Sequence, residues 1–256
     1  MTKSGKTAPA DFPVDMTVRQ VRPRTLMVDE ITFAQVPFFD GMSLRPLKMN
    51  LMYRRRKPGV RMPVLLFLCG GAWLQMDKDL WIPELVSFTR RGFAVACAEY
   101  RTSGVAEWPA QLEDVKAAIR WLRAHPDSEC WSLDTSAIAV MGESAGGHLA
   151  VMAGATGGTR EFDTGDWLEQ DSRVQAVVDY YGPTDFLRMA DRPTDFDHNA
   201  EGSPESRLIG GAVQLRPDRA ASASPFPYLT RETPPHLILH GTADRLVPCN
   251  QSELLF

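Results

Sequence analysis

Metal-binding cysteine patterns are missing from this sequence. Its four cysteines stand far apart, and neither C-x-x-C nor H-E-x-x-H occurs. A structural or catalytic zinc site is therefore not predicted. Separate thiols at Cys69, Cys97, Cys130 and Cys249 fit a reducing compartment better than a disulfide framework.

Long apolar runs and long basic runs are missing as well. No apolar run approaches the roughly 20 residues that span a membrane, and residues 1–16 lack the apolar centre of a signal peptide. We therefore expect a cytoplasmic protein with no membrane partner. The net charge is −4, and the densest basic cluster, Arg54 to Lys57, is followed by Pro58 and Gly59, as expected for a solvated hairpin end. No nucleic-acid partner is expected.

Short apolar runs alternate with amphipathic helical patterns through most of the chain. The expected strands are Arg24–Phe39, Leu47–Tyr53, Pro63–Leu68, Phe93–Ala98, Ile138–Met141, Val174–Tyr180 and His236–His240, and the expected helices are Ile82–Arg91, one that begins at Pro109, and one through Leu149–Ala153. This alternation predicts an α/β fold, a mostly parallel sheet with helices on both faces. The turn signal Asp40-Gly41 predicts that an antiparallel hairpin opens the sheet.

The domain organisation follows from length and local composition. A chain of 256 residues is long enough for one large domain, which we expect over residues 21–256. Residues 1–20 are polar and interrupted by Pro9 and Pro13, so we expect a loose arm there. Residues 188–232 are rich in Pro, Ser, Asp and Arg, and we predict an inserted cap or lid with little core of its own.

One stretch carries the clearest chemistry. Gly142-Glu143-Ser144-Ala145-Gly146 fits G-x-S-x-G and lies between a predicted buried strand and a predicted helix. This context is typical of a nucleophile elbow, in which a strained turn exposes a serine hydroxyl at a helix N-terminus. The amide of Ala145 would there stabilise a developing oxyanion. The alternative is a glycine-rich connection with an incidental serine.

Two further strand ends support the elbow. The apolar run Pro63–Leu68 is followed by a Cys-Gly-Gly-Ala-Trp loop at residues 69–73, whose amides are suited to complete an oxyanion hole. The last predicted strand is followed by Asp244, where an acid that orients a catalytic histidine would lie. Functional residues gather beyond the carboxyl ends of parallel strands, so we expect these loops to meet.

These residues give the sequence a family resemblance. The stretches CGGAW, AVMGESAGGHLA, DYYGPTDF, SPESRLIGG and HGTADRLVP are similar to α/β-hydrolase esterases related to hormone-sensitive lipase, especially the acetylxylan or feruloyl esterase-like branch. The resemblance implies the α/β-hydrolase fold and hydrolysis of carboxylic esters with small, acetyl-like acyl groups, without a metal or other cofactor. It implies that Ser144 is the nucleophile, Asp244 the acid, and Gly71, Ala72 and Ala145 the amide donors of the oxyanion hole.

The sequence departs from the family pattern in two places. The family loop usually begins with histidine, where this chain has Cys69, and cysteine is expected to loosen the loop without removing its amides. The family histidine follows the acid by a helix and another strand, whereas this sequence reads to Phe256. We therefore expect the last strand and the catalytic histidine to be missing. His240 is expected to brace the Asp244 loop.

Other residues near the predicted site have competing interpretations. Glu143 is either a brace beside the nucleophile or an exposed turn residue. Trp73 and Tyr181 either line a substrate pocket or pack in the core. His148, one helical turn beyond the nucleophile, is expected to pack its helix rather than act as the base. His198 lies in the insert, where nothing in the sequence orients it.

Three functions stay open at this point. The leading one is a serine carboxylesterase that acts on a small-molecule ester through an acyl-enzyme at Ser144. The missing histidine favours a second one, a catalytically inactive fragment or binding module. The third is an amidase or formamidase on the same fold. We also expect self-association, because the strand His236–His240 would present an apolar, unpaired sheet edge.

Overall fold

The computed structural model describes residues 24–38, 41–55 and 59–256. The expected arm over residues 1–20 lies outside the described residues. So do Asp40 of the predicted turn and two members of the basic cluster, Arg56 and Lys57.

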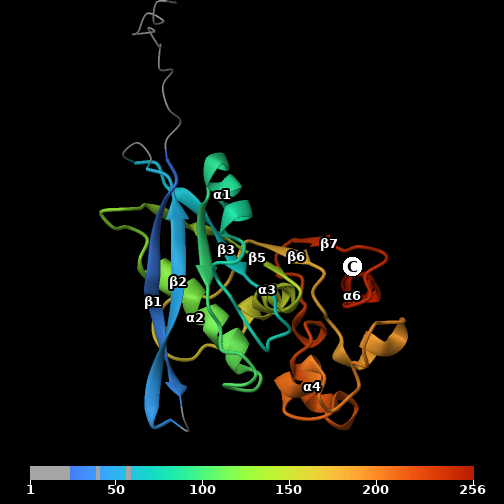
Figure 1. Cartoon of the computed structure of the whole chain (residues 1–256). Helices are drawn as coiled ribbons and strands as arrows, with labels where there is room; N and C mark the ends of the chain where they lie inside the picture. Colours follow the sequence, from blue (N-terminus) through green and yellow to red (C-terminus); the bar gives the residue numbers. More distant parts are fainter. Residues whose placement is uncertain (1–23, 39–40, 56–58) are drawn as a thin grey trace, which may run out of the picture.

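The described strands form one seven-stranded sheet in the order β1-β2-β4-β3-β5-β6-β7 (Figure 1). Their bounds are β1 Leu26–Phe38, β2 Ser43–Tyr53, β3 Met62–Leu68, β4 Ala94–Ala98, β5 Leu133–Glu143, β6 Ala176–Tyr180 and β7 His236–Leu239. β1 and β2 pair antiparallel, as do β2 and β4, whereas all the other neighbouring pairs are parallel. The predicted mostly parallel sheet and its opening hairpin are confirmed.

Helices cover both faces of this sheet. Their bounds are α1 Ile82–Arg91, α2 Ala110–Ala124, α3 Ala145–Ala155, α4 Pro204–Ile209, α5 Pro217–Ser222 and α6 Asn250–Leu255, with short 3-10 turns η1 Thr156–Gly158, η2 Phe186–Asp191, η3 Val213–Leu215 and η4 Phe226–Tyr228. α1 ends where it is expected to, at Gly92, which adopts a left-handed φ of 112° that suits glycine.

The side chains of β3 show how the two faces are filled. Val64, Leu66 and Leu68 belong to the larger apolar cluster, to which α2 and α3 also contribute. Leu65 and Phe67 point the other way into a smaller cluster with residues of α1. Alternation along a strand therefore sends neighbouring residues to opposite layers, and burying each leucine side chain stabilises the fold by roughly 1.5–3 kcal/mol.

The strand that leads to the elbow is longer than predicted. The apolar pattern indicates Ile138–Met141, but β5 begins at Leu133, where it already pairs with Met62 of β3. Its first half includes polar residues such as Asp134, which join the ladder through backbone hydrogen bonds that do not depend on side-chain polarity.

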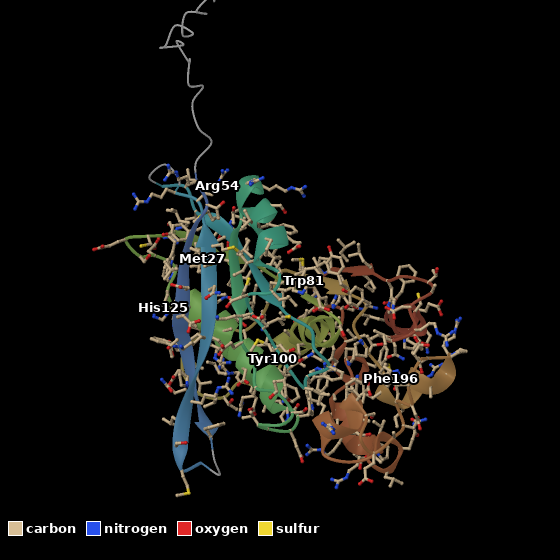
Figure 2. All side chains as sticks on the ribbon, viewed as in Figure 1. Met27, Arg54, Trp81, Tyr100, His125 and Phe196 are labelled. Atoms are coloured by element: carbon tan, nitrogen blue, oxygen red, sulfur yellow. The ribbon has the colours of Figure 1, made fainter. Side chains whose placement is uncertain are left out.

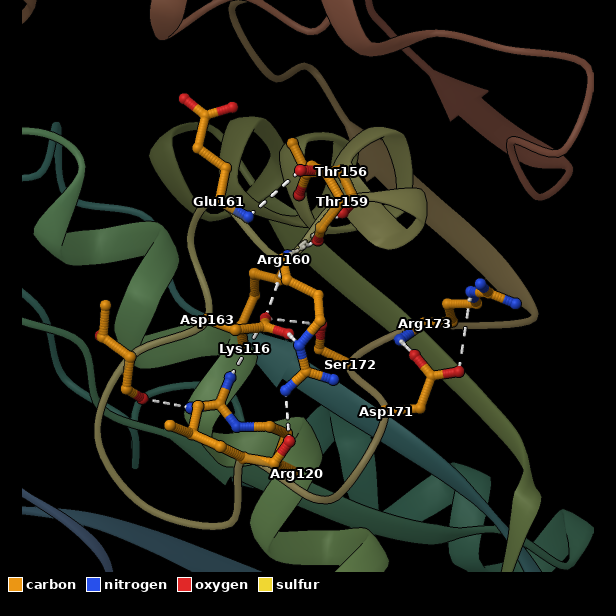
Figure 3. Close-up of polar contacts among 12 residues, drawn as sticks. Lys116, Arg120, Thr156, Thr159, Arg160, Glu161, Asp163, Asp171, Ser172 and Arg173 are labelled. Carbon is orange, nitrogen blue, oxygen red and sulfur yellow. Dashed lines mark hydrogen bonds and ion pairs between the residues drawn. The ribbon is translucent and has the colours of Figure 1, made fainter.

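A buried charge cluster fastens the loop after α3 to α2. Nζ of Lys116 lies 3.1 Å, and a guanidinium nitrogen of Arg120 3.2 Å, from the same oxygen of Asp163 (Figure 3). Lys116 also donates to the carbonyl of Thr156, at the end of α3, over 3.1 Å. Buried charges need such partners, so these contacts hold the far end of the elbow helix in place.

The predicted insert, residues 188–232, holds α4, α5 and short 3-10 turns. Its buried apolar residues Leu208, Ile209, Val213 and Ala220 join the larger cluster of the sheet. The insert therefore packs onto the main core, and its role as a cap stays a prediction.

Candidate active site

The predicted site loops come together because their strands are neighbours. β3, β5, β6 and β7 are adjacent and parallel, so their carboxyl ends lie at one edge of the sheet. The loop at residues 69–73 leaves β3, Ser144 follows β5, Tyr181 follows β6, and Asp244 lies in the loop after β7.

Ser144 has the backbone conformation expected of a nucleophile elbow. Its φ and ψ are 54° and −122°, a region that non-glycine residues rarely occupy. Its amide donates to the carbonyl of Tyr180 over 2.8 Å, which ties the turn to β6. A methyl group at Gly146 would collide with the carbonyl oxygen of Leu68. Close contact between the elbow helix and β3 therefore requires glycine at that position.

Among the described residues, the predicted oxyanion donors have free backbone amides. Ala145 is the first residue of α3, and the first amides of a helix have no acceptor within it. In residues 24–38, 41–55 and 59–256, no acceptor takes a hydrogen bond from the amides of Gly71, Ala72 or Ala145. Amides left unpaired in this way are suited to an oxyanion.

Glu143 braces the glycine loop. Its Oε1 accepts a hydrogen bond from the Gly70 amide over 2.5 Å, while the Tyr100 hydroxyl donates to the carbonyl of Cys69 over 2.7 Å. Burial raises the pKa of the Cys69 thiol, so this residue is a neutral side chain where the family usually has histidine. The brace interpretation of Glu143 is confirmed, and Glu143 and Tyr100 hold a loop that Cys69 was expected to loosen.

Asp244 is held by its own loop. One carboxylate oxygen, Oδ1, accepts from the amides of Leu246 and Val247 over 2.8 and 3.0 Å. The other, Oδ2, lies 3.8 Å from Nε2 of His240. His240 also donates to the carbonyl of Val247 over 2.8 Å and bonds the hydroxyl of Ser252 over 2.7 Å. It spans the loop as the expected brace does.

A hollow of about 380 Å³ opens beside Ser144. It is lined by Ala72, Trp73, Ser144, Ala145, Pro183, Phe196, His198, Pro204, Glu205, Leu246 and Val247. Phe196 brings the insert to this wall, on the side of the molecule away from the hairpin (Figure 2). A mostly apolar hollow with few polar groups is typical of a small-molecule site.

Trp73 and Tyr181 have different positions relative to this hollow. Trp73 lines it and is also packed, since it is only 1% exposed and its ring lies 5.4 Å from that of Phe186. Tyr181 is not among the residues that line this hollow, and its pocket role stays a prediction. Its amide donates to the carbonyl of Leu239 over 2.9 Å and its ring lies 6.3 Å from that of His240. These contacts direct Tyr181 toward β7.

His148 packs the elbow helix, as expected. It is fully buried among the rings of Trp73, Trp108 and Phe186. Its Nε2 donates to the carbonyl of Ala223 over 2.7 Å. Burial lowers its pKa to about 4, so it is neutral near pH 7. None of the five histidines, all of which lie in the described part of the chain, hydrogen-bonds the Ser144 hydroxyl.

The expectation that nothing orients His198 is wrong. His198 is 1% exposed, with Nδ1 3.0 Å from Oε1 of Glu205 and Nε2 3.1 Å from the carbonyl of Leu246. Glu205, the partner of His198, was not among the predicted site residues. Its signal was SPESRLIGG, where Ser203 accepts a hydrogen bond from Ser206 as the N-cap of α4 and Pro204 follows. These residues place Glu205 in the first turn of that helix.

The described residues contain no arrangement typical of a metal site or of a membrane-spanning helix. No group of three or more His, Cys, Asp or Glu side chains there has the arrangement to hold a metal ion. The helices of that part of the chain are too short or too polar to cross a membrane. The cysteines are unpaired, and the cytoplasmic location stays a prediction.

Comparison with known proteins finds relatives of this chain. The model of the BD-FAE family matches residues 51–256. Esterase LipC of Mycobacterium tuberculosis is 32% identical over 206 residues, covering 80% of this chain and 50% of its own. The probable carboxylic ester hydrolase LipM of the same organism is 35% identical over 197 residues, covering 75% of this chain and 43% of its own. The chain thus spans about half the length of the curated relatives it matches.

A solved structure described as a truncated form of carbohydrate esterase from gut microbiota superimposes with a TM-score of 0.75. It is 29% identical, and the alignment covers 90% of this chain and 81% of that one. The architecture is therefore that of the α/β-hydrolase esterases, and the family resemblance of the sequence is confirmed.

Proposed function

Because the chain belongs to the BD-FAE family, whose matched relatives are esterases, we propose that it is a serine carboxylesterase that hydrolyses small-molecule esters through an acyl-enzyme at Ser144. The observation that carries the proposal is the meeting of a strained serine, free amides and a held carboxylate at adjacent strand ends, beside an apolar hollow.

The residues have distinct parts in this reaction. The Ser144 hydroxyl oxygen attacks the ester carbonyl as its proton passes to a general base. None of the five histidines of this chain, all of them described, is free to act as that base in this geometry. The amides of Gly71, Ala72 and Ala145 stabilise the oxyanion of the tetrahedral intermediate. The alcohol leaves, and water then hydrolyses the acyl-enzyme. Removing one oxyanion donor from such a site lowers kcat by about 10²–10³-fold.

Asp244 orients the base in this scheme. Its carboxylate is fixed by the amides of Leu246 and Val247 and touches His240 at 3.8 Å. His240 is not free to take the proton, because Nε2 faces the carbonyl of Val247 and Nδ1 bonds Ser252. The five histidines of this chain are thus occupied elsewhere.

That observation favours a second candidate, a binding module with the same hollow. In subtilisin, losing the base alone lowers kcat by about 2 × 10⁶-fold. The rate of ester hydrolysis by this chain therefore separates the candidates by orders of magnitude.

The acyl group that we propose is small and uncharged, such as acetyl. The lining of the hollow is mostly apolar, which supports an uncharged group. The related carbohydrate esterase supports an acylated sugar as the alcohol side.

A phosphonylating active-site probe tests the proposal directly. A fluorophosphonate should label the wild-type chain at Ser144, and that chain should hydrolyse 4-nitrophenyl acetate. The Ser144→Ala protein should be neither labelled nor active. Equal labelling of both proteins would refute the nucleophile assignment. Labelling without turnover, in a chain of verified intact mass, would support the binding module, and faster hydrolysis of an N-formyl substrate than of the acetate ester would indicate an amidase.

A further inference from the structure

The loop that carries Asp244 is joined to the insert. The amide of Asp195 donates to the carbonyl of Arg245 over 2.8 Å, and the Arg245 guanidinium lies 2.5 Å from the Asp195 carboxylate. His198, three residues farther along the insert, bonds the carbonyl of Leu246. The insert and the acid loop are therefore linked along consecutive residues.

Leu246 connects this link to the acid itself. Its amide donates to Oδ1 of Asp244 over 2.8 Å, and its carbonyl is bonded by Nε2 of His198 over 3.1 Å. The place of the Asp244 carboxylate therefore depends on the Leu246 backbone, which His198 fixes from the other side.

The protons on His198 follow from its partners. A carbonyl oxygen can only accept, so Nε2 must carry a hydrogen toward Leu246. Nδ1 lies 3.0 Å from Oε1 of Glu205, and one proton is shared between them. Whether the pair is an imidazolium with a carboxylate or a neutral imidazole with a carboxyl group, Nε2 keeps its hydrogen.

Burial makes this pairing obligatory. His198 is 1% and Glu205 3% exposed, and an isolated charge at that depth is strongly unfavourable. The other oxygen of Glu205, Oε2, has no hydrogen-bond partner among the described residues. Glu205 therefore has His198 as its polar partner there, in the way that a second group fixes the tautomer of a functional histidine.

The same contacts exclude His198 as the base in this geometry. A general base needs a free lone pair within reach of the serine proton. Nε2 carries its hydrogen toward Leu246 and Nδ1 shares a proton with Glu205, although His198 lines the same hollow as Ser144.

We propose that His198 is a positioning residue that, paired with Glu205, holds Leu246 and thereby fixes Asp244 at the active site. The structural link stands on these contacts alone, while its meaning for catalysis rests on the proposed function.

Two substitutions of similar size separate the two bonds of His198. His198→Gln keeps a side-chain N–H where Nε2 reaches the carbonyl of Leu246. His198→Asn keeps an N–H only near the position of Nδ1, which faces Glu205, and loses the contact with Leu246. Residue-resolved amide hydrogen exchange of the Leu246 and Val247 amides is the measurement, since both amides donate to Asp244. We expect His198→Asn to speed their exchange about tenfold and His198→Gln to stay within about twofold of wild type.

A core amide of β3, such as Leu66, serves as the internal control. Acceleration of Leu66 to the same extent as Leu246 would mean general destabilisation and would overturn the proposal. Equal exchange in the Asn and Gln variants would also overturn it.

A measurement on the wild-type chain covers the case in which a variant does not fold. Long-range proton–nitrogen NMR correlation should find hydrogen on Nε2 of His198, and a ring protonated on Nδ1 alone would contradict the assignment. Neither readout needs turnover. A wild-type chain that fails to hydrolyse esters would refute the proposed function. The hydrogen-exchange and NMR results on His198 would still decide whether His198 holds Leu246.

Discussion

Replacing Ser144 with glycine should stabilise the protein relative to replacing it with alanine. Ser144 has a φ of 54° and a ψ of −122°, and a side chain held in such a region costs about 1–3 kcal/mol. Glycine removes that cost but loses about 0.5–1 kcal/mol through its freer unfolded chain. The Ser144→Gly protein should therefore be about 1 kcal/mol more stable than Ser144→Ala, which keeps the strained Cβ.

Thermal or urea unfolding of the two variants measures this difference. For a domain of this size, about 1 kcal/mol corresponds to a shift of about 2–4 °C in Tm. The hydroxyl is absent from both proteins, so the lost contacts of the hydroxyl cancel in the comparison.

Ser136 provides the matched control. It lies on β5, the strand that leads to the elbow, is exposed, and is not among the residues with positive φ. Ser136→Gly should therefore be less stable than Ser136→Ala. If glycine were also the less stable substitution at position 144, the elbow would carry no strain and the argument would fail.

Four further perturbations have defined outcomes. Glu143→Ala leaves the Gly70 amide without its acceptor and should lower the unfolding free energy by about 1–3 kcal/mol. Glu143→Gln keeps an oxygen and should lower it less. Equal losses of the two variants in denaturant titrations would contradict the role of Glu143 as a brace. Burial raises the pKa of Asp179 from 3.8 to about 7. Between about pH 4 and pH 7 the unfolded chain therefore releases a proton that the folded chain keeps. The stability of the folded state falls as the pH rises through this range. Asp179→Asn should thus stabilise the folded protein by a few kcal/mol at about pH 8 and by little at about pH 4. An equal gain in stability at both pH values would refute the raised pKa of Asp179. A thiol reagent should modify exposed Cys130 first, and Cys130→Ser should remove that fast phase in a mass-resolved time course. Leu237 on the edge strand β7 is 58% exposed. Sedimentation of the wild-type protein should show concentration-dependent association, and Leu237→Lys should abolish it. A wild-type protein that stays monomeric would rule out association through β7.

The local parts of the site were predictable from sequence. A buried strand, G-x-S-x-G and a helix follow one another directly in the chain, so the elbow depends on neighbouring residues alone. The sheet class was predictable too, because apolar runs alternating with amphipathic helices have few other ways to bury their apolar faces. The order of the serine and Asp244 along the chain then indicated which strand ends would meet.

Exact strand ends needed the structure. The first half of β5 pairs with β3 through its backbone, and its polar side chains hide that pairing from any pattern of hydrophobicity. The orientation of Tyr181 toward β7 depends on a left-handed backbone, with a φ of 45°, that its side chain does not favour.

The link from Glu205 through His198 to Leu246 was decided by tertiary structure alone. His198 and Glu205 lie in the insert, whereas Leu246 lies in the loop after β7. The spacing of these residues in the sequence therefore does not predict their contact. The sequence determined which residues are chemically able to share a proton, because that depends on residue type. The tertiary structure decided that they do, because burial at the hollow removes water and leaves each polar atom only the partners that the packed loops provide.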